Sequence, residues 1–345
     1  MTNNIKENIH KGVSIIICTY NGKQRLPETL RHIVLQNIDI PCEVILIDNA
    51  STDGTKQEVD RWWDTYGLHT TITYQSYSQP KPGKSYAQEL GYEKAQYDYL
   101  LICDDDNWLC NTYVQTAFDT MESNIEIGAL GGWCEAVFES EHPVWFQQYA
   151  KYYAVGKQAE NSGDVTEQTG YLYGAGMVIR KAHWRELLHL GFQHILSCRK
   201  GDTLSSGGDT EYCFALRLLG YKIWYDERLH FKHFMTLGRL NFAYLTRLRK
   251  AMTYSNFVIL AYRDVLYKQV MSRAGQRRRV LGLLQAGFFK NIIRFVFGTY
   301  EQKEVGRTYF KRLYYLCFCY EHYLKHVTII EQWVSRHRSK ILGYE

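Results

Sequence analysis

The sequence lacks the cysteine spacing of metal-knuckle and dithiol redox proteins. Its nine cysteines include no CxxC pair, and Cys317 and Cys319 form the only close couple. An odd number of scattered cysteines favours a chain whose thiols are reduced and buried. We therefore expect a cytoplasmic protein without a disulfide framework.

Long apolar runs and phosphate-loop motifs are also missing. No window reaches 18 uninterrupted apolar residues, and residues 1–12 are too polar for a secretory signal. We therefore expect neither an ordinary transmembrane helix nor a leader. Gly83-Lys84-Ser85 does not belong to a Walker A loop, because that motif requires glycine at the position of Ser78.

The composition that is present indicates a globular protein. The 345 residues are 46% hydrophobic and 22% charged, but the charge is unevenly spread. Residues 1–240 hold 22 Lys+Arg and 30 Asp+Glu, whereas residues 241–345 hold 19 and 6, so the net charge of +5 divides into −8 and +13. We predict an acidic domain over 1–240 and a helical, basic and aromatic region over 241–345.

Strand-like and helix-like segments alternate along the acidic part. Short apolar runs predict the strands, and apolar residues at helical spacing predict the helices between them. The predicted strands are 13–18, 43–47, 71–77, 99–103, 129–138, 171–179 and 222–225, and the predicted helices are 26–35, 55–66, 85–95, 112–121 and 210–219. This alternation indicates an α/β fold with a mostly parallel sheet covered by helices on both faces.

Polar clusters follow three of these strands. They are Thr19-Tyr20-Asn21, the segment 48–54 and Asp104-Asp105-Asp106-Asn107. Ligands of open α/β sheets bind outside the carboxyl ends of the strands. We therefore expect the three clusters to meet at one edge of the sheet.

The acidic run at 104–106 favours a cation site, because adjacent carboxylates repel one another. Oxygen donors of this kind suit Mg²⁺ or Mn²⁺, although an acidic turn at a helix start is the structural alternative. Asp48 stands where a side chain can bond a nucleotide's base or ribose, whereas Asp53-Gly54 is typical of a turn that caps a helix. Lys84 either reaches a phosphate or is a solvated surface lysine.

A second set of candidates lies downstream. Asp209 follows two glycines at the start of a predicted helix, where its carboxylate either accepts a proton from an attacking hydroxyl or caps the helix. Alternation in the segment 229–234 puts His230 and Lys232 on one face and His233 on the other. His233 is thus either a contact of a metal or diphosphate or a structural histidine.

Taken together, these motifs resemble family 2 glycosyltransferases of the GT-A fold, of the type that builds bacterial surface polysaccharides. The resemblance covers about residues 12–236 and not the basic region. Its motifs are VSIIICTYN at 13–21, VILIDNASTDGT at 44–55, the DxD-type Asp104-Asp105-Asp106, GAGMVIRK at 174–181 and Gly208-Asp209-Thr210-Glu211. Gly208 departs from the pattern, because the family often has glutamate there.

The resemblance implies a Rossmann-like GT-A domain and a role for each matched residue. Asp209 would be the catalytic base, and Asp106 and His233 would hold Mn²⁺ or Mg²⁺. Trp133, Glu135 and Glu211 would lie on the acceptor side. The nucleotide pocket would contain Thr19, Tyr20, Asn21, Arg25, Asp48, Asn49, Lys84, Asp104 and Asp105.

The expected activity is metal-dependent, inverting transfer of a sugar from a nucleotide-sugar donor, with UDP as first choice. The acceptor would be a hydroxyl of a glycan or of a lipid-linked glycan. A sugar nucleotidyltransferase and an inactive membrane-surface scaffold are the alternatives. The basic aromatic region suits the cytoplasmic face of a membrane, or an ordinary helical subdomain, and shows no nucleic-acid-binding module.

Overall fold

The protein is described by a computed structural model over residues 10–196 and 207–341. The chain divides into two compact units. Unit 1 comprises Met1–Glu186 and Tyr221–Thr236, and unit 2 comprises Leu187–Gly220 and Leu237–Glu345. This division differs from a boundary at residue 240, because residues 187–220 group with the C-terminal helices.

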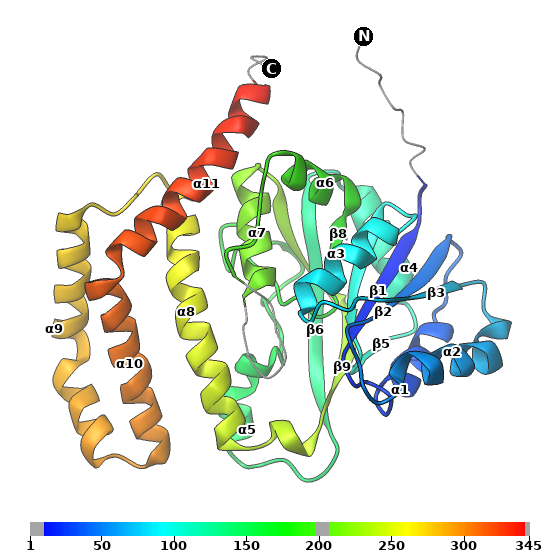
Figure 1. The fold of residues 1–345 in the computed structure, drawn as a ribbon, viewed down its shortest axis with the longest axis horizontal. Coiled ribbons are helices and arrows are strands. Elements are labelled where there is room, and N and C mark those ends of the chain that lie inside the picture. Colours follow the sequence, from blue (N-terminus) through cyan, green and yellow to red (C-terminus); the bar gives the residue numbers. More distant parts are fainter. Residues whose placement is uncertain (1–9, 197–206, 342–345) are drawn as a thin grey trace. The chain divides into compact units, whose positions relative to one another are not determined.

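Unit 1 is built on one mixed sheet with the strand order β3-β2-β1-β4-β8-β6-β9-β5, and β7 pairs with β9 (Figure 1). The neighbours β3, β2, β1 and β4 are parallel, as are β6 and β9, whereas β8 and β5 run antiparallel to their partners. The strands are β1 (Val13–Thr19), β2 (Cys42–Asp48), β3 (Thr73–Ser78), β4 (Tyr99–Asp104), β5 (Asn107–Leu109), β6 (Ile127–Phe138), β7 (Gly163–Asp164), β8 (Val178–Arg180) and β9 (Lys222–Met235).

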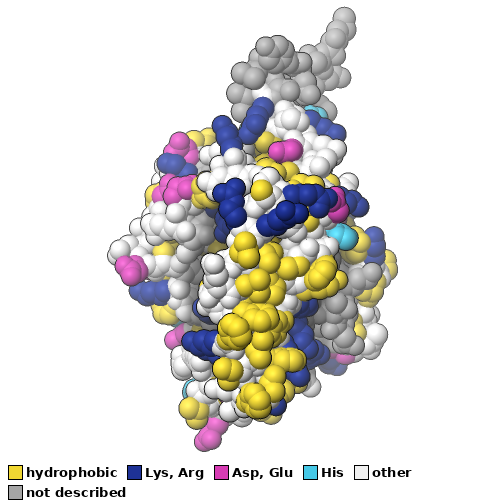
Figure 2. Space-filling view, turned by 90° about the vertical axis from the view of Figure 1, so that its left-hand side faces the viewer, with side chains coloured by type: hydrophobic (Ala, Val, Ile, Leu, Met, Phe, Trp, Pro, Cys, Tyr) yellow, Lys and Arg dark blue, Asp and Glu magenta, His cyan; other side chains and the backbone are white. Residues whose placement is uncertain are grey.

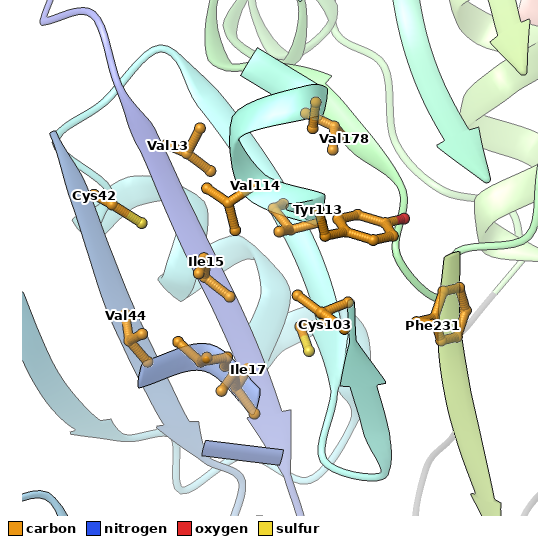
Figure 3. Close-up of a cluster of buried hydrophobic side chains, with 14 of the residues drawn as sticks. Val13, Ile15, Ile17, Cys42, Val44, Cys103, Tyr113, Val114, Val178 and Phe231 are labelled. Atoms are coloured by element: carbon orange, nitrogen blue, oxygen red, sulfur yellow. The ribbon is translucent and has the colours of Figure 1, made fainter. Parts of the chain in front are cut away.

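Helices cover both faces of this sheet, as its continuous apolar strands predict. Odd-numbered positions of β1, such as Ile15 and Ile17, belong to a core that includes Val114 (Figure 3). On the opposite face Ile16 lies so close to Gly91 that a Cβ there would come within 2.4 Å of it. The helices of unit 1 are α1 (Leu26–Val34), α2 (Thr55–Tyr66), α3 (Lys84–Lys94), α4 (Tyr113–Ser123), α5 (Phe146–Tyr149) and α6 (Lys181–His189), the last of which ends just inside unit 2.

Most predicted elements agree with the structure, and two differ. The predicted strand at 171–179 is wrong over most of its length, because only β8 forms there and Gly176 adopts a φ of +73° that breaks the extended chain. The predicted strand at 222–225 continues to Met235 in β9, so the histidine segment is itself a sheet strand.

Unit 2 is helical. The buried Glu211 of α7 (Gly208–Leu218) accepts a hydrogen bond from Tyr262 of α8 (Phe242–Leu266), which explains why 187–220 groups with the C-terminal helices. The chain continues as α9 (Arg273–Phe297), α10 (Tyr300–Phe318) and α11 (Tyr320–Ile341). The helical character predicted for the C-terminal region is confirmed.

Candidate active site

Three strand ends meet at one edge of the sheet in unit 1. In the register of the parallel strands, Thr19 pairs with Asp48, Cys18 pairs with Asp104, and Asp48 pairs with Ser78. The polar clusters that follow β1, β2 and β4 therefore lie side by side. The predicted convergence is confirmed.

Asp105 is bound by residues of the same edge. Its carboxylate accepts hydrogen bonds from Thr19 Oγ1 at 2.6 Å and from Arg25 Nε and Nη2 at 3.1 and 2.7 Å. Its backbone carbonyl accepts a further bond from Thr29 Oγ1 at 3.0 Å. Asp105 and Arg25 thus form an ion pair with each other in this structure. Their predicted contact with a nucleotide stays a prediction.

The neighbouring carboxylates also have partners that carry, or can carry, positive charge. Lys84 Nζ donates a hydrogen bond to Asp104 Oδ1, and His233 Nε2 lies 3.5 Å from Asp106 Oδ1. Asp106 is only 2% exposed. Arg25 and Lys84 therefore relieve the repulsion expected among three consecutive carboxylates at Asp105 and Asp104, and His233 lies beside the third.

The thiol of Cys103, just before this acidic run, is affected by the same three carboxylates. Burial raises its pKa well above the ordinary value, and Asp104, Asp106 and Asp105 raise it further. The thiol accordingly stays protonated at neutral pH.

The acidic edge can contribute two ligands to a metal but not a complete shell. Within the described residues, no group of three or more His, Cys, Asp or Glu side chains is placed to hold an ion. The pair Asp106 and His233 suits a cation that takes its remaining ligands from water and a diphosphate. The donor set therefore fits Mn²⁺ or Mg²⁺ bound together with a nucleotide.

One carboxylate oxygen of Asp48 has no hydrogen-bond partner among the described residues. The side chain is 8% exposed, and its Oδ1 is buried without a hydrogen bond among the described residues. Such an atom costs free energy unless a ligand or water donates to it. It lies beside Thr19 at the strand ends, where it can accept a hydrogen bond from an N–H or O–H; its predicted contact with a nucleotide stays a prediction.

Two asparagines shape the loops around Asp48. Asn49 Nδ2 donates to the carbonyls of Gln79 and Lys81, and its Oδ1 accepts from the Gly83 N–H, which fixes the loop before Lys84. Asn21, in a left-handed conformation with φ of 49°, accepts from the Thr52 N–H at 2.8 Å. Both residues act on backbone groups in this structure.

Two side chains beside Asn21 differ in what they offer. Tyr20 is 54% exposed, so its ring is open to a ligand. Asp53 Oδ1 accepts from the Thr55 N–H at the start of α2, which confirms the turn interpretation of Asp53-Gly54.

A separate group lies on the paired strands β6 and β9. The rings of Trp133 and His230 are 4.3 Å apart, and His230 Nε2 is 3.8 Å from Glu135 Oε1. Burial lowers the pKa of His230, and Glu135 opposes that effect. His233 lies on the other face and is buried, as alternation predicts, while the acceptor role of Trp133 and Glu135 stays a prediction.

Asp209 and Glu211 both belong to unit 2 and differ in setting. Gly207, with a φ of +97°, is the N-cap residue of α7, so the alternative that Asp209 is the N-cap residue is wrong. Asp209 Oδ1 instead accepts a hydrogen bond from the Thr210 N–H, within the first turn, at 2.9 Å. Glu211 is fully buried, and its carboxylate accepts from the N–H groups of Ile195 and Leu196 and from Tyr262. This arrangement gives Glu211 a structural function and lends no support to an acceptor-side role.

Local sequence patterns do not indicate the partners that organise the edge. Thr29 is 76 residues from Asp105 in the chain, and Gly83 is 34 residues from Asn49. No local spacing marks such pairs. Only the pairing of β1, β2 and β4 brings them together.

Comparison with known proteins places this sequence in a family. The family described as "Glycosyl transferase family 2" matches residues 14–188. The glucosyl-dolichyl phosphate glucuronosyltransferase of Haloferax volcanii is 24% identical over 260 residues, which cover 74% of this chain and 79% of that protein. Abequosyltransferase RfbV of Salmonella typhimurium is 34% identical over 97 residues, or 27% of this chain and 28% of that one.

A solved structure has the same fold. S. aureus TarS 1-349, in complex with UDP-GlcNAc, aligns over 96% of this chain and 92% of that chain, with a TM-score of 0.50 and 15% sequence identity. At that identity the likeness shows the GT-A architecture alone.

Proposed function

This chain belongs to glycosyl transferase family 2, which transfers a sugar from a nucleotide-sugar donor, and we propose that it is a metal-dependent, inverting enzyme that uses a UDP-sugar and a lipid-linked glycan acceptor. The observation that supports this proposal best is the shared sheet edge of Asp48, Asp104 and Asp106. The alternative of a sugar nucleotidyltransferase is less well supported, because the matching family transfers sugars.

The nucleoside would bind at Asp48. Its unpartnered Oδ1 is a hydrogen-bond acceptor that suits the N–H of a base or a ribose hydroxyl. Exposed Tyr20 offers a ring beside it for stacking. UDP is the first donor to test, and the TarS complex with UDP-GlcNAc supports that order.

The diphosphate would bind where Lys84 and the pair Asp106 and His233 face the edge. When bound, Mn²⁺ or Mg²⁺ would stabilise negative charge on the leaving diphosphate. Lys84 would add a positive charge from the start of α3 by exchanging its bond to Asp104 for one to a phosphate oxygen. The carboxylate of Asp106, together with His233, would hold the ion.

Transfer would proceed in one displacement. The acceptor oxygen forms a bond to the anomeric carbon while the bond from that carbon to the diphosphate oxygen breaks, and the diphosphate leaves with the electron pair. The hydroxyl proton passes to the carboxylate of Asp209. This role rests on the Gly208–Glu211 motif.

The acceptor proposal rests on the archaeal relative, whose name specifies a lipid-linked sugar as its substrate. Trp133, which packs against His230, would offer an aromatic face to a sugar ring, with Glu135 beside it. Synthesis of a cell-surface polysaccharide is the process that such a substrate would serve.

A thermal-shift panel tests the donor site. UDP, GDP, CDP and dTDP are each added with and without Mn²⁺, since a ligand that binds only the native state raises the midpoint of unfolding. We expect a Mn²⁺-dependent shift with UDP that Asp106→Ala abolishes and that Asp119→Ala, an exposed carboxylate change on α4, leaves intact. A shift with another base would overturn the UDP assignment, and no shift at millimolar ligand would favour the inactive scaffold.

Catalysis is tested separately with Asp209→Asn. We expect hydrolysis and transfer of the sugar to collapse while the nucleotide-dependent thermal shift remains. Retained activity would remove Asp209 from the mechanism.

A further inference from the structure

An apolar strip lies along the outer side of α9 in unit 2. Phe289 is 79% exposed and Phe297 is 82% exposed. Figure 2 shows the strip as a nearly continuous hydrophobic surface. The outer face of α9 comprises five apolar side chains that are each at least half exposed: Leu281, Phe289, Ile293, Val296 and Phe297.

This outer face is separate from the side on which α9 packs. Phe288 and Phe295 of α9 both contact the ring of Phe310 on α10, with ring centroids 6.1 and 5.7 Å apart. Tyr309 of α10 donates to the carbonyl of Leu283 at 2.6 Å. One apolar side of α9 therefore packs against α10. The stability of this hairpin does not require the second apolar side, which faces outward.

The charge around the outer face is strongly positive. Residues 273–319 contain ten Lys and Arg and two Glu, and one of those, Glu304, is buried and paired with Arg307. Lys and Arg side chains flank the strip in Figure 2. A second copy packed through the same face of α9 would bring like charges together, whereas an anionic surface would neutralise them.

Two of these cations lie among the apolar side chains. A hollow on the same hairpin is lined by Lys290, Arg294, Ile293, Phe297, Gly298 and Gln302. Apolar groups beside cations match the boundary between acyl chains and headgroup phosphates in a bilayer. This composition distinguishes a lipid surface from a soluble acidic protein.

By length and composition, α9 is the one described helix that could cross a membrane, contrary to the expectation from uninterrupted apolar runs. A search for uninterrupted apolar residues does not find α9, because Lys290 and Arg294 interrupt its apolar segment. If α9 spanned the membrane, it would either separate from α10 or carry charged side chains of α10, such as Arg312, into the hydrocarbon. A helix in the plane of the interface keeps both its packing and its hydrated charges.

We propose that the outer face of α9 docks the protein onto a membrane surface that contains anionic lipids. Phe289, Ile293 and Phe297 enter the acyl boundary, and Lys290 and Arg294 bind headgroup phosphates. This binding does not depend on the proposed transferase activity, so the two proposals can fail separately.

Vesicle flotation of the full chain tests the docking. Vesicles of phosphatidylcholine alone are compared with vesicles that also contain phosphatidylglycerol. We expect binding mainly to the anionic vesicles, weakened by added salt, and reduced at least about tenfold by Phe289→Ser/Ile293→Ser/Phe297→Ser. A matched variant, Leu68→Ser/Ile125→Ser/Val144→Ser, changes exposed apolar residues of unit 1 and should bind like the unaltered protein.

Charge and folding are checked in parallel. Lys290→Gln/Arg294→Gln should remove much of the preference for phosphatidylglycerol, and circular dichroism should show all variants equally helical. The salt dependence of the unaltered protein tests the proposal even where a variant misfolds. Equal flotation of the α9 and unit 1 variants would overturn the proposal. A second contrary result is self-association without vesicle binding: sedimentation velocity would show that the unaltered protein associates and that only the α9 variant does not.

Discussion

Arg25 and Asp105 form a two-point ion pair between positions 80 residues apart in the chain. The pair joins the loop after β1 to the acidic run after β4, and both side chains are largely shielded from solvent. Arg25 also donates to the carbonyls of Tyr20 and Asn21. One arginine therefore fixes two of the three clusters at the candidate site.

Asp105→Ala should destabilise unit 1. The change leaves Arg25 and Thr19 without their acceptor, and breaking a largely buried, hydrogen-bonded pair costs about 2–4 kcal/mol. Urea denaturation measures the loss. The control is Glu58→Ala, which removes a solvent-accessible partner of Lys23 and Arg61, 3.6 Å from each, and should change stability by less than about 0.5 kcal/mol. Equal losses for the two variants would contradict the structural role of the pair.

Lys84→Ala should weaken binding of a nucleoside diphosphate. Lys84 Nζ lies against Asp104 at the sheet edge, and loss of its charge removes a contact to phosphate worth about 1.5–3 kcal/mol, or about ten- to a hundredfold in Kd. Calorimetric titration with UDP and Mn²⁺ measures it. Lys81→Ala is the matched control, because Lys81 lies in the same loop with its ammonium over the ring of Tyr86. If both variants bind UDP as the unaltered protein does, Lys84 is a structural lysine.

Glu211→Gln and Asp209→Asn should behave differently although they are two residues apart. Glu211 is buried and accepts hydrogen bonds from two backbone N–H groups and Tyr262, so an amide that can accept through only one oxygen should cost about 2–3 kcal/mol. Asp209 is only part-buried and should cost under about 1 kcal/mol. Thermal unfolding of the two variants checks this contrast, and a reversed order would show that the buried network of Glu211 is not formed.

The sequence was sufficient to predict the parallel strands β1 to β4, the acidic edge and the helical C-terminal region, because local apolar pattern determines them. It did not limit the strand at 171–179 to β8 or extend the strand at 222–225 to Met235. It did not indicate that Asp105 is engaged by Arg25, since that pairing depends on the register of β1 and β4. The grouping of 187–220 with unit 2 follows from the burial of Glu211 against Tyr262, which no local pattern carries. The sequence indicated a basic and aromatic region, but which side chains of α9 are exposed depends on its packing against α10.

His183 should make unit 1 less stable in mild acid. Burial, with a smaller effect from Arg180, lowers the pKa of His183 from 6.5 to about 4, and its Nδ1 has no hydrogen bond among the described residues. The unfolded chain therefore binds a proton that the folded chain does not, so stability is unaffected above pH 6.5 and falls as the pH drops from 6.5 toward 4. The full shift corresponds to about 3 kcal/mol.

His183→Phe should remove this contribution while keeping a ring against Tyr221, whose ring centroid is 3.7 Å away. Urea denaturation at pH 7.5 and at pH 5 should show a smaller loss of stability in acid for this variant than for the unaltered protein, by about 1–2 kcal/mol. His69→Phe, at an exposed position, should leave the pH dependence unchanged. If His183→Phe loses as much stability in acid as the unaltered protein, the proton that destabilises unit 1 binds elsewhere.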